Sequence, residues 1–223
     1  MREQMNNSKL KFSFADRYTQ EYSNKYYERH KKGILKKFSN ILEQNMAAKA
    51  LKMAGFPKSV LDLPCGAGRF FQTILNMGCE RVVAGDSSPG MLQVIKDRFP
   101  PEILNKLELL ELDLADINLP DKSVDSILCM RFMHHIHDPQ HRLAIYKELQ
   151  RVARDTVCIS NWSEGNYKSY REHLYAKRKG IASRCLNPAL LEKEFADAGF
   201  TIIGKVDMLP GILYWRTYVL KVS

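Results

Sequence analysis

The stretch Val60-Leu61-Asp62-Leu63-Pro64-Cys65-Gly66-Ala67-Gly68-Arg69-Phe70 decides the fold of this chain. It opens on an apolar run that is typical of a strand buried on both faces. Gly66 and Gly68 follow, and glycine lets the backbone approach a ligand closely because it has no Cβ. Apolar residues then recur at helical spacing, at Phe70, Phe71, Ile74 and Leu75. The stretch therefore predicts a buried strand, a tight turn and the start of a helix.

The turn differs from the glycine-rich fingerprint of dinucleotide-binding proteins. That fingerprint has a third small residue three positions after its second glycine, where the pyrophosphate meets the helix N-terminus. Here Phe71 occupies that position, and the acidic Asp62 stands at the front of the turn. An acid suits a cationic ligand better than a diphosphate. An ordinary crossover between strand and helix is the alternative.

The segment Asp62-Leu-Pro-Cys-Gly66-Ala-Gly68 resembles motif I of class I S-adenosylmethionine (SAM) dependent methyltransferases, which we take to be of the type with a small-molecule or lipid acceptor. Pro64 departs from the motif, because a glycine usually stands there. The resemblance implies that SAM is the cofactor and S-adenosylhomocysteine the product. The resemblance also implies that the turn itself binds SAM, through Asp62, Pro64, Cys65, Gly66 and Gly68.

The rest of the chain alternates between strand and helix patterns. Apolar runs at 81–85, 107–112, 124–130 and 156–160 follow the first strand, with helical patterns between them. This alternation predicts a parallel sheet with helices on both faces. Two further runs, at 200–206 and 212–222, are joined by a short turn and predict an antiparallel hairpin. We therefore expect an α/β, Rossmann-like three-layer sandwich, and the resemblance implies the strand order 3-2-1-4-5-7-6.

Helix signals complete this outline. Ser88-Pro89, Asp138-Pro139 and Asn187-Pro188 each join a capping side chain to a proline, which is typical of helix starts. A helical pattern also covers 34–54 and, with many basic residues, 167–184. We expect residues 1–57 to form an N-terminal helical lid and residues 58–223 to form the SAM-binding domain, in one compact unit.

Acids at the ends of the second and third strands are the next cofactor candidates, since ligands of open parallel sheets bind at the carboxyl ends of strands. Asp86-Ser-Ser-Pro-Gly-Met91 resembles motif II of the family, which implies that Asp86 accepts hydrogen bonds from the ribose hydroxyls. Stabilisation of the following helix is the alternative role for Asp86. The resemblance extends the predicted cofactor site to Ser87, to Met91 near the adenine or in the helix core, to Asp113 and Leu114 at the adenine amino group, and to Met130.

Three histidines follow the fourth strand, within Arg131-Phe-Met-His134-His135-Ile-His137. In the family a histidine often stands here, at the substrate cleft, which makes His134 and His135 the catalytic candidates. Imidazole titrates near neutral pH, so His135 could act as a general base, although a structural role is an equal alternative. We expect no metal site. Arg131 is a candidate contact for an anionic substrate, or a bridge to the N-terminal segment.

The net charge of +9 is unevenly placed, with +8 in residues 1–58, +5 in residues 167–184 and −4 in the rest of the chain. If both flank the cleft, its mouth is positive and attracts an anionic acceptor. A solvated helix face, for the basic residues, and packing of the lid, for the tyrosines, are the alternatives. Including Arg131, the candidate substrate contacts are Tyr18, Tyr22, Tyr26, Arg29, His30 and Lys37 in the lid and Tyr170 and Arg171 in the later segment.

These features favour a methyltransferase acting on a small or lipid-linked anionic substrate. A nucleic-acid methyltransferase, with basic segments along the phosphates, is the second reading. A SAM-binding or membrane-surface module without catalysis is the third. The five scattered cysteines predict reduced, buried thiols, and no apolar run reaches the roughly 18 residues of a membrane span. We expect a cytoplasmic protein with at most peripheral membrane contact.

Overall fold

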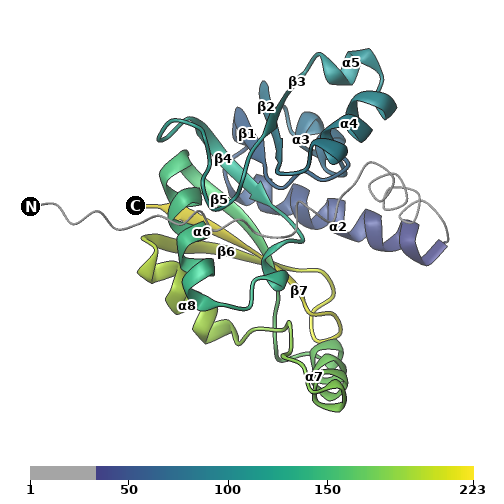
Figure 1. Cartoon of the computed structure of the whole chain (residues 1–223), viewed down its shortest axis with the longest axis vertical. Coiled ribbons are helices and arrows are strands. Elements are labelled where there is room, and N and C mark those ends of the chain that lie inside the picture. The colour runs from purple at the N-terminus through teal and green to yellow at the C-terminus, as the bar shows by residue number, and fades with distance from the viewer. Residues whose placement is uncertain (1–33) are drawn as a thin grey trace, which may run out of the picture.

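The computed structural model describes residues 34–223, with side chains from Phe38 onward. The predicted substrate contacts Tyr18, Tyr22, Tyr26, Arg29 and His30 lie outside the described residues, and so does the side chain of Lys37. The described part folds around a seven-stranded sheet in the order β3-β2-β1-β4-β5-β7-β6, which confirms the predicted Rossmann-like topology (Figure 1).

The strands keep the predicted positions. They are β1 (Ser59–Asp62), β2 (Arg81–Asp86), β3 (Leu107–Glu111), β4 (Val124–Cys129), β5 (Ala153–Trp162), β6 (Phe200–Asp207) and β7 (Trp215–Val222). The first five pair in parallel, and β7 lies antiparallel to both β5 and β6. The predicted hairpin is therefore β6–β7.

Several boundaries differ from the prediction: β5 begins at Ala153, and the helix expected over 167–184 ends at Lys179. β5 continues to Trp162 because β7 pairs with it as far as Trp162 and Trp215. β7 begins at Trp215 rather than at residue 212, because the loop before it forms hydrogen bonds with a helix instead of with a strand. The carbonyls of Gly211 and Ile212 accept hydrogen bonds from the first two residues of a neighbouring helix, both at 3.0 Å.

The helices are α2 (Ile34–Met53), α3 (Phe71–Asn76), α4 (Pro89–Arg98), α5 (Pro101–Leu104), α6 (Pro139–Val152), α7 (Tyr167–Lys179) and α8 (Pro188–Asp197), with a 3₁₀ turn, η2, at Met133–His135. The predicted caps are present: Ser88, Asp138 and Asn187 each accept a backbone hydrogen bond at the start of a helix. The sequence did not predict α5 or η2.

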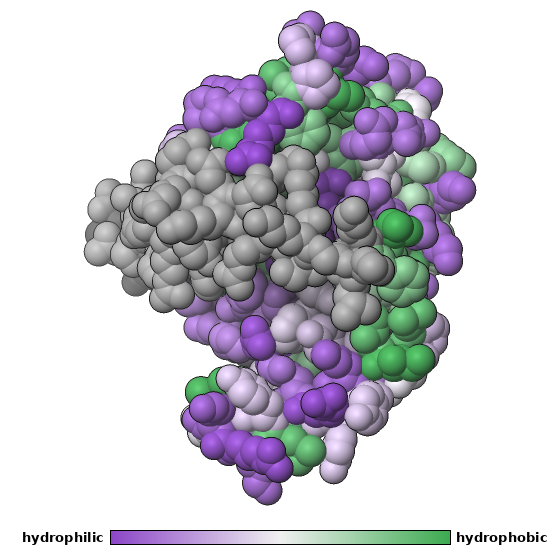
Figure 2. All heavy atoms as spheres, turned by 90° about the vertical axis from the view of Figure 1, so that its right-hand side faces the viewer, coloured by the Kyte–Doolittle hydropathy of each residue, from purple (hydrophilic) through white to green (hydrophobic). Residues whose placement is uncertain are grey.

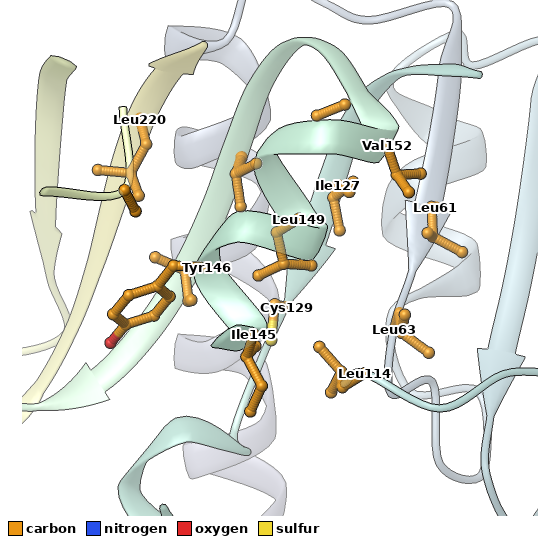
Figure 3. Close-up of a cluster of buried hydrophobic side chains, with 14 of the residues drawn as sticks. Leu61, Leu63, Leu114, Ile127, Cys129, Ile145, Tyr146, Leu149, Val152 and Leu220 are labelled. Carbon is orange, nitrogen blue, oxygen red and sulfur yellow. The ribbon is translucent and has the colours of Figure 1, made fainter. Parts of the chain in front are cut away.

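The helices bury both faces of the sheet. On one face α6 packs on the central strands and α8 on β6, and Figure 3 shows Leu149 of α6 beside Ile127 and Tyr146 on the side of Leu220. On the other face α2 inserts Met46, Ala47, Ala50 and Leu51 against the sheet. Neighbouring residues of β1 therefore enter opposite cores, as the unbroken apolar run predicted.

All five cysteines are buried and unpaired with one another. In the part of the chain from residue 34 onward, no helix combines the length and the apolar character that crossing a bilayer requires.

Candidate active site

The predicted cofactor residues meet at one edge of the sheet, because the parallel strands β1, β2 and β4 all end there. The turn after β1 rests on the end of β2: the Cys65 amide donates to the Gly85 carbonyl at 2.7 Å. The segment after β3 joins the same edge, since the Leu112 amide donates to the Asp86 carbonyl at 3.2 Å.

The two glycines of the turn have different structural roles. Both have positive φ, +54° at Gly66 and +76° at Gly68, a region that favours glycine. A Cβ on Gly66 would meet no atom within 4 Å, so this side of the turn is open. A Cβ on Gly68 would lie 2.4 Å from Phe71 Cε2, so Gly68 allows the turn to pack on α3. The Leu63–Pro64 peptide before them is cis.

Asp62 is the most unusual group at this edge. Its side chain is fully buried, and within the described residues neither carboxylate oxygen has a hydrogen-bond partner. Burial, and then the nearby Asp86, raise the pKa of Asp62 well above its usual value. A buried carboxyl without a donor costs free energy, about 1–3 kcal/mol for an unsatisfied polar group. Its position therefore indicates that a ligand supplies the missing donor or positive charge.

Asp86 is held from two sides. One carboxylate oxygen accepts the Gly66 amide at 2.8 Å, and the other accepts the Ser88 amide at 2.9 Å. Burial raises the pKa of Asp86, although these two hydrogen bonds oppose the shift. Each oxygen keeps a second lone pair, which can accept a hydroxyl. Ser87 is half-buried beside it, and Met91 is buried in α4.

The remaining predicted cofactor residues surround these acids. Asp113 is half-buried and accepts the Ala115 amide at 2.9 Å, which fixes the carboxylate just beyond β3. Leu114 belongs to the core under α6. Met130 is buried at the end of β4, with its sulfur 3.9 Å from the Thr217 hydroxyl. The predicted contacts of these residues with a cofactor stay predictions.

The segment after β4 places two histidines beside an aromatic cluster. His134 is buried and stacks on Trp162, with ring centroids 4.4 Å apart and 11° between the planes. Trp215 meets His134 edge-on at 5.1 Å, and Tyr214 stacks on Trp162 at 4.1 Å. Among the described residues, His134 Nδ1 and Trp162 Nε1 have no hydrogen-bond partner. We call His134, Trp162, Tyr214 and Trp215 the aromatic cluster.

The two histidines differ in exposure and in proton affinity. Burial, and then the neighbouring His135 and Arg131, lower the pKa of His134 to about 2, so it is neutral at physiological pH. His135 is exposed and lies 4.0 Å from His134, centroid to centroid. The pKa of His135 is lowered too, first because its ring is partly desolvated and then because of the positive charge of Arg184. An exposed neutral imidazole can accept a proton, so His135 is better placed than His134 to act as a base.

Two guanidinium groups border the aromatic cluster. Arg131 Cζ lies 5.3 Å from the centre of the Trp215 ring, and Arg184 Cζ lies 4.4 Å from that of Trp162. Arg131 has a positive φ of 62°, and its amide donates to Ser160 Oγ at 2.7 Å. Arg184 also pairs with Glu172 at 3.2 Å, and Arg131 shares the Glu43 carboxylate with Arg69. Three guanidinium groups therefore face two carboxylates here, which leaves an excess of positive charge on this side of the edge.

Glu43 of α2 was missed in the sequence, and it connects three parts of the site. Its carboxylate pairs with Arg69 of the motif I turn and with Arg131 after β4, while its side chain is 2% exposed. The Ser39 hydroxyl also donates to it at 3.2 Å. One buried acid therefore fixes both loops to α2, which agrees with the predicted bridge from Arg131 to the N-terminal segment. An acid inside the apolar face of a helix is a signal that could have revealed it.

Tyr170 and Arg171 lie on α7, which projects from the body of the molecule (Figure 1). Both are exposed. Tyr170 lines an open groove with Glu164, Asn166 and His173. The predicted role of Tyr170 and Arg171 in substrate binding stays a prediction.

The strand order and the turn after β1 are those of the Rossmann-like fold found in SAM-dependent methyltransferases. Residues 60–156 match a family described as "Methyltransferase domain". An uncharacterized methyltransferase-like protein of Schizosaccharomyces pombe is 29% identical over 91 residues, which are 41% of this chain and 34% of that protein. The match thus covers about a third of that relative's length.

Solved structures share the fold over nearly the whole chain. Magnesium protoporphyrin IX methyltransferase from Synechocystis, with bound S-adenosylhomocysteine, superposes with a TM-score of 0.73 at 20% identity, covering 94% of this chain and 97% of that one. A SAM-dependent methyltransferase from Clostridium acetobutylicum gives 0.70 at 16% identity, covering 90% and 98%. At these identities the comparison concerns the fold.

The residues at the edge fit SAM, which carries an ammonium, a sulfonium and two ribose hydroxyls. Asp62 lacks a donor or cation that such a ligand can supply, and the open side of Gly66 leaves backbone accessible. Asp86 has acceptor capacity left for hydroxyls. These residues would hold the cofactor, and Asp113 would stand beside them at the end of β3.

Proposed function

We propose that this chain transfers a methyl group from SAM to a small or lipid-linked, anionic acceptor. The observation that carries the proposal is the pair of guanidinium groups, Arg131 and Arg184, on the two tryptophans that pack against His134. Positive charge next to an aromatic surface suits an acceptor with an apolar body and a negatively charged group. We also propose that residues 1–57 act as a lid over this edge.

Methyl transfer from SAM requires little from the protein beyond alignment of the acceptor with the methyl group. When bound, SAM supplies a methyl group on a sulfonium, which is an activated leaving group. The protein then has to hold the acceptor in line with that methyl, and orientation alone can lower a barrier by about 7–11 kcal/mol. Where the acceptor atom carries a proton, His135 takes it, since its lowered pKa keeps the imidazole neutral at pH 7.

A small-molecule acceptor also agrees with one structural neighbour, which is named for magnesium protoporphyrin IX. That name describes the neighbour, and the acceptor of this chain is our proposal. Within the proposal, His134 supports the site by stacking on Trp162 instead of exchanging protons, because burial lowers its pKa to about 2.

A labelling experiment tests this function. A cell extract is incubated with the full chain and SAM that carries a labelled methyl group, and is then separated into small-molecule, lipid, RNA and protein pools. We expect label in the small-molecule or lipid pool, and strongly reduced labelling with Asp86→Ala. Label in RNA alone contradicts the proposed acceptor, and absence of label from every pool, with SAM bound, contradicts catalysis.

His135→Gln separates the base from the binding groups. If His135 accepts the proton, the variant lowers kcat strongly and leaves the Kd for SAM within about twofold, since the site geometry is kept. An unchanged kcat contradicts the proton-transfer role of His135.

A further inference from the structure

One side of α7 faces away from the rest of the fold. Its inward stripe is Ser169, Glu172 and Ala176, spaced one helical turn apart, and Ser169 and Ala176 are buried. The residues directly opposite are all exposed, at the positions of Tyr167, Arg171, Leu174 and Arg178. This side of α7 is therefore aromatic, aliphatic and basic at once.

The exposed apolar side chains continue beyond the helix. Ile181 follows the C-terminal cap of α7, and its amide donates to the Ala176 carbonyl at 3.1 Å. Ile212 lies at the other end, because its carbonyl accepts the Lys168 amide at 3.0 Å. We call the following set the α7 patch, whose members are each at least 40% exposed: Tyr167, Tyr170, Leu174, Tyr175, Ile181 and Ile212.

Basic residues surround this patch. Five of the thirteen residues of α7 are Lys or Arg and one is Glu, so the helix carries a formal charge of +4 with His173 neutral. They are Lys168, Arg171, Lys177, Arg178 and Lys179. Figure 2 shows the lobe that contains α7 at the lower end of the molecule, with hydrophobic and hydrophilic residues side by side and a notch between the lobe and the body.

We propose that the α7 patch docks the protein onto an anionic phospholipid bilayer. Clustered Lys and Arg are attracted to the negative surface potential of such a membrane. Tyrosine favours the head-group region because its ring is apolar and its hydroxyl is polar. Leu174, Ile181 and Ile212 enter the boundary between head groups and acyl chains, as apolar residues of interfacial helices do. Long basic side chains keep their charged ends at the surface meanwhile.

The aliphatic side chains decide between a bilayer and a nucleic acid. Basic residues alone suffice to bind phosphates, and tyrosines can stack on bases. Exposed leucine and isoleucine contribute to neither interaction, whereas they add apolar area to a bilayer contact. The mixture of Leu174, Ile181 and Ile212 with five cations therefore favours the lipid surface.

The position of α7 gives the docking a consequence. α7 follows β5, and the carboxyl end of β5 lies at the same edge as the aromatic cluster. A membrane bound to the patch would therefore bring a lipid-linked acceptor to this edge. That consequence rests on the proposed function, whereas the docking itself requires neither SAM nor catalysis.

Vesicle flotation with the full chain tests the proposal. We expect the protein to float with mixed phosphatidylcholine and phosphatidylglycerol vesicles and to stay behind with phosphatidylcholine alone. Lys177→Glu with Arg178→Glu should lower the partition coefficient at least about tenfold. Lys96→Glu with Lys106→Glu is the matched control, because it makes the same charge change at exposed positions of α4 and the turn after α5. The control should change partitioning less than about threefold.

Leu174→Ser with Ile212→Ser tests the aliphatic contribution and keeps every charge. This variant should also lose at least about threefold in partitioning, with thermal unfolding and SAM binding unchanged. Equal losses of partitioning in the α7 charge variant and the control overturn the proposal, because membrane binding then depends on the overall charge and not on α7. Flotation that is insensitive to Leu174→Ser with Ile212→Ser overturns it too, as does tighter binding to single-stranded RNA than to the mixed vesicles.

Discussion

Glu43→Gln removes the negative charge that holds two loops of the site together. Glu43 pairs with Arg69 and Arg131, and its side chain is 2% exposed. Glutamine keeps the shape of the side chain and can accept hydrogen bonds through one oxygen, but it cannot balance the two guanidinium charges. Both arginines would then stand close together without a counter-ion.

The expected loss is large compared with the stability of a domain. Removing one partner of a buried ion pair costs about 3–5 kcal/mol. The side chains of Arg69 and Arg131 are 17% and 28% exposed, so water relieves part of the penalty. We therefore expect the lower end, about 3 kcal/mol, from a total of roughly 5–15 kcal/mol. For a chain of this length that corresponds to a fall in Tm of about 6–12 °C.

Urea unfolding of Glu43→Gln and Glu108→Gln measures the difference. Glu108 pairs with Arg81 through two hydrogen bonds of 2.8 and 2.9 Å, but these two side chains are 49% and 44% exposed. An exposed pair contributes about 0–1 kcal/mol, so Glu108→Gln is the matched control. The Kd for SAM should rise only in Glu43→Gln, because Arg69 follows the motif I turn. Losses within about 1 kcal/mol of each other would refute the reasoning.

Asp62→Leu should stabilise the ligand-free protein by about 1 kcal/mol in urea, because an apolar side chain of similar shape replaces two buried oxygens that have no partners, and should weaken SAM binding in calorimetry. Because the pKa of Asp62 is raised, the contribution of this group to native stability falls as the pH rises above about 4, and Asp62→Leu should remove this contribution. Gly66→Ala should cost about 1–2 kcal/mol of backbone strain and reduce SAM affinity, whereas Gly68→Ala should cost more stability because its Cβ meets Phe71. His134 has a pKa of about 2, so acidification from pH 7 to 5 should lower the free energy of unfolding by about 2 kcal/mol through this group. In His134→Phe, the same acidification should lower the free energy of unfolding by about 2 kcal/mol less. An unchanged stability of Asp62→Leu, equal unfolding midpoints for the two glycine variants, or equal acid sensitivity with and without His134 would each contradict the corresponding prediction.

Local patterns predicted the fold because each element depends on its own residues. The apolar run of β1 predicts a strand buried on both faces, and the core receives Val60 on one face and Leu61 on the other. Ser88, Asp138 and Asn187 cap helices because the cap is formed within a few residues. The strand order came from the resemblance, since no local pattern specifies which strands are neighbours.

The site was predicted less completely, because its contacts join residues far apart in the sequence. Glu43 and Arg131 are 88 residues apart, and the bond between Glu43 and Arg69 spans 26. The aromatic cluster likewise combines the 3₁₀ turn with β5 and the start of β7. Motifs predicted the acids of the cofactor edge, because those acids stand at strand ends that any parallel sheet brings together. The predicted start of β7 was wrong, because the loop before β7 accepts hydrogen bonds from α7.

The polar groups of this fold divide into two kinds, and the division indicates which of them bind a ligand. Glu43 and Arg142 are buried with charged partners, Glu43 with Arg69 and Arg131 and Arg142 with Glu194, and Arg142 also donates to the carbonyls of Ile136 and His137. Such groups fix loops, and their loss should reduce stability first. Asp62 is buried without a partner at the edge where the strands end. A fold retains such a cost where a ligand recovers it, so the loss of Asp62 should reduce affinity and raise stability. Loss of Glu43 and loss of Asp62 should therefore change stability in opposite directions while both weaken SAM binding.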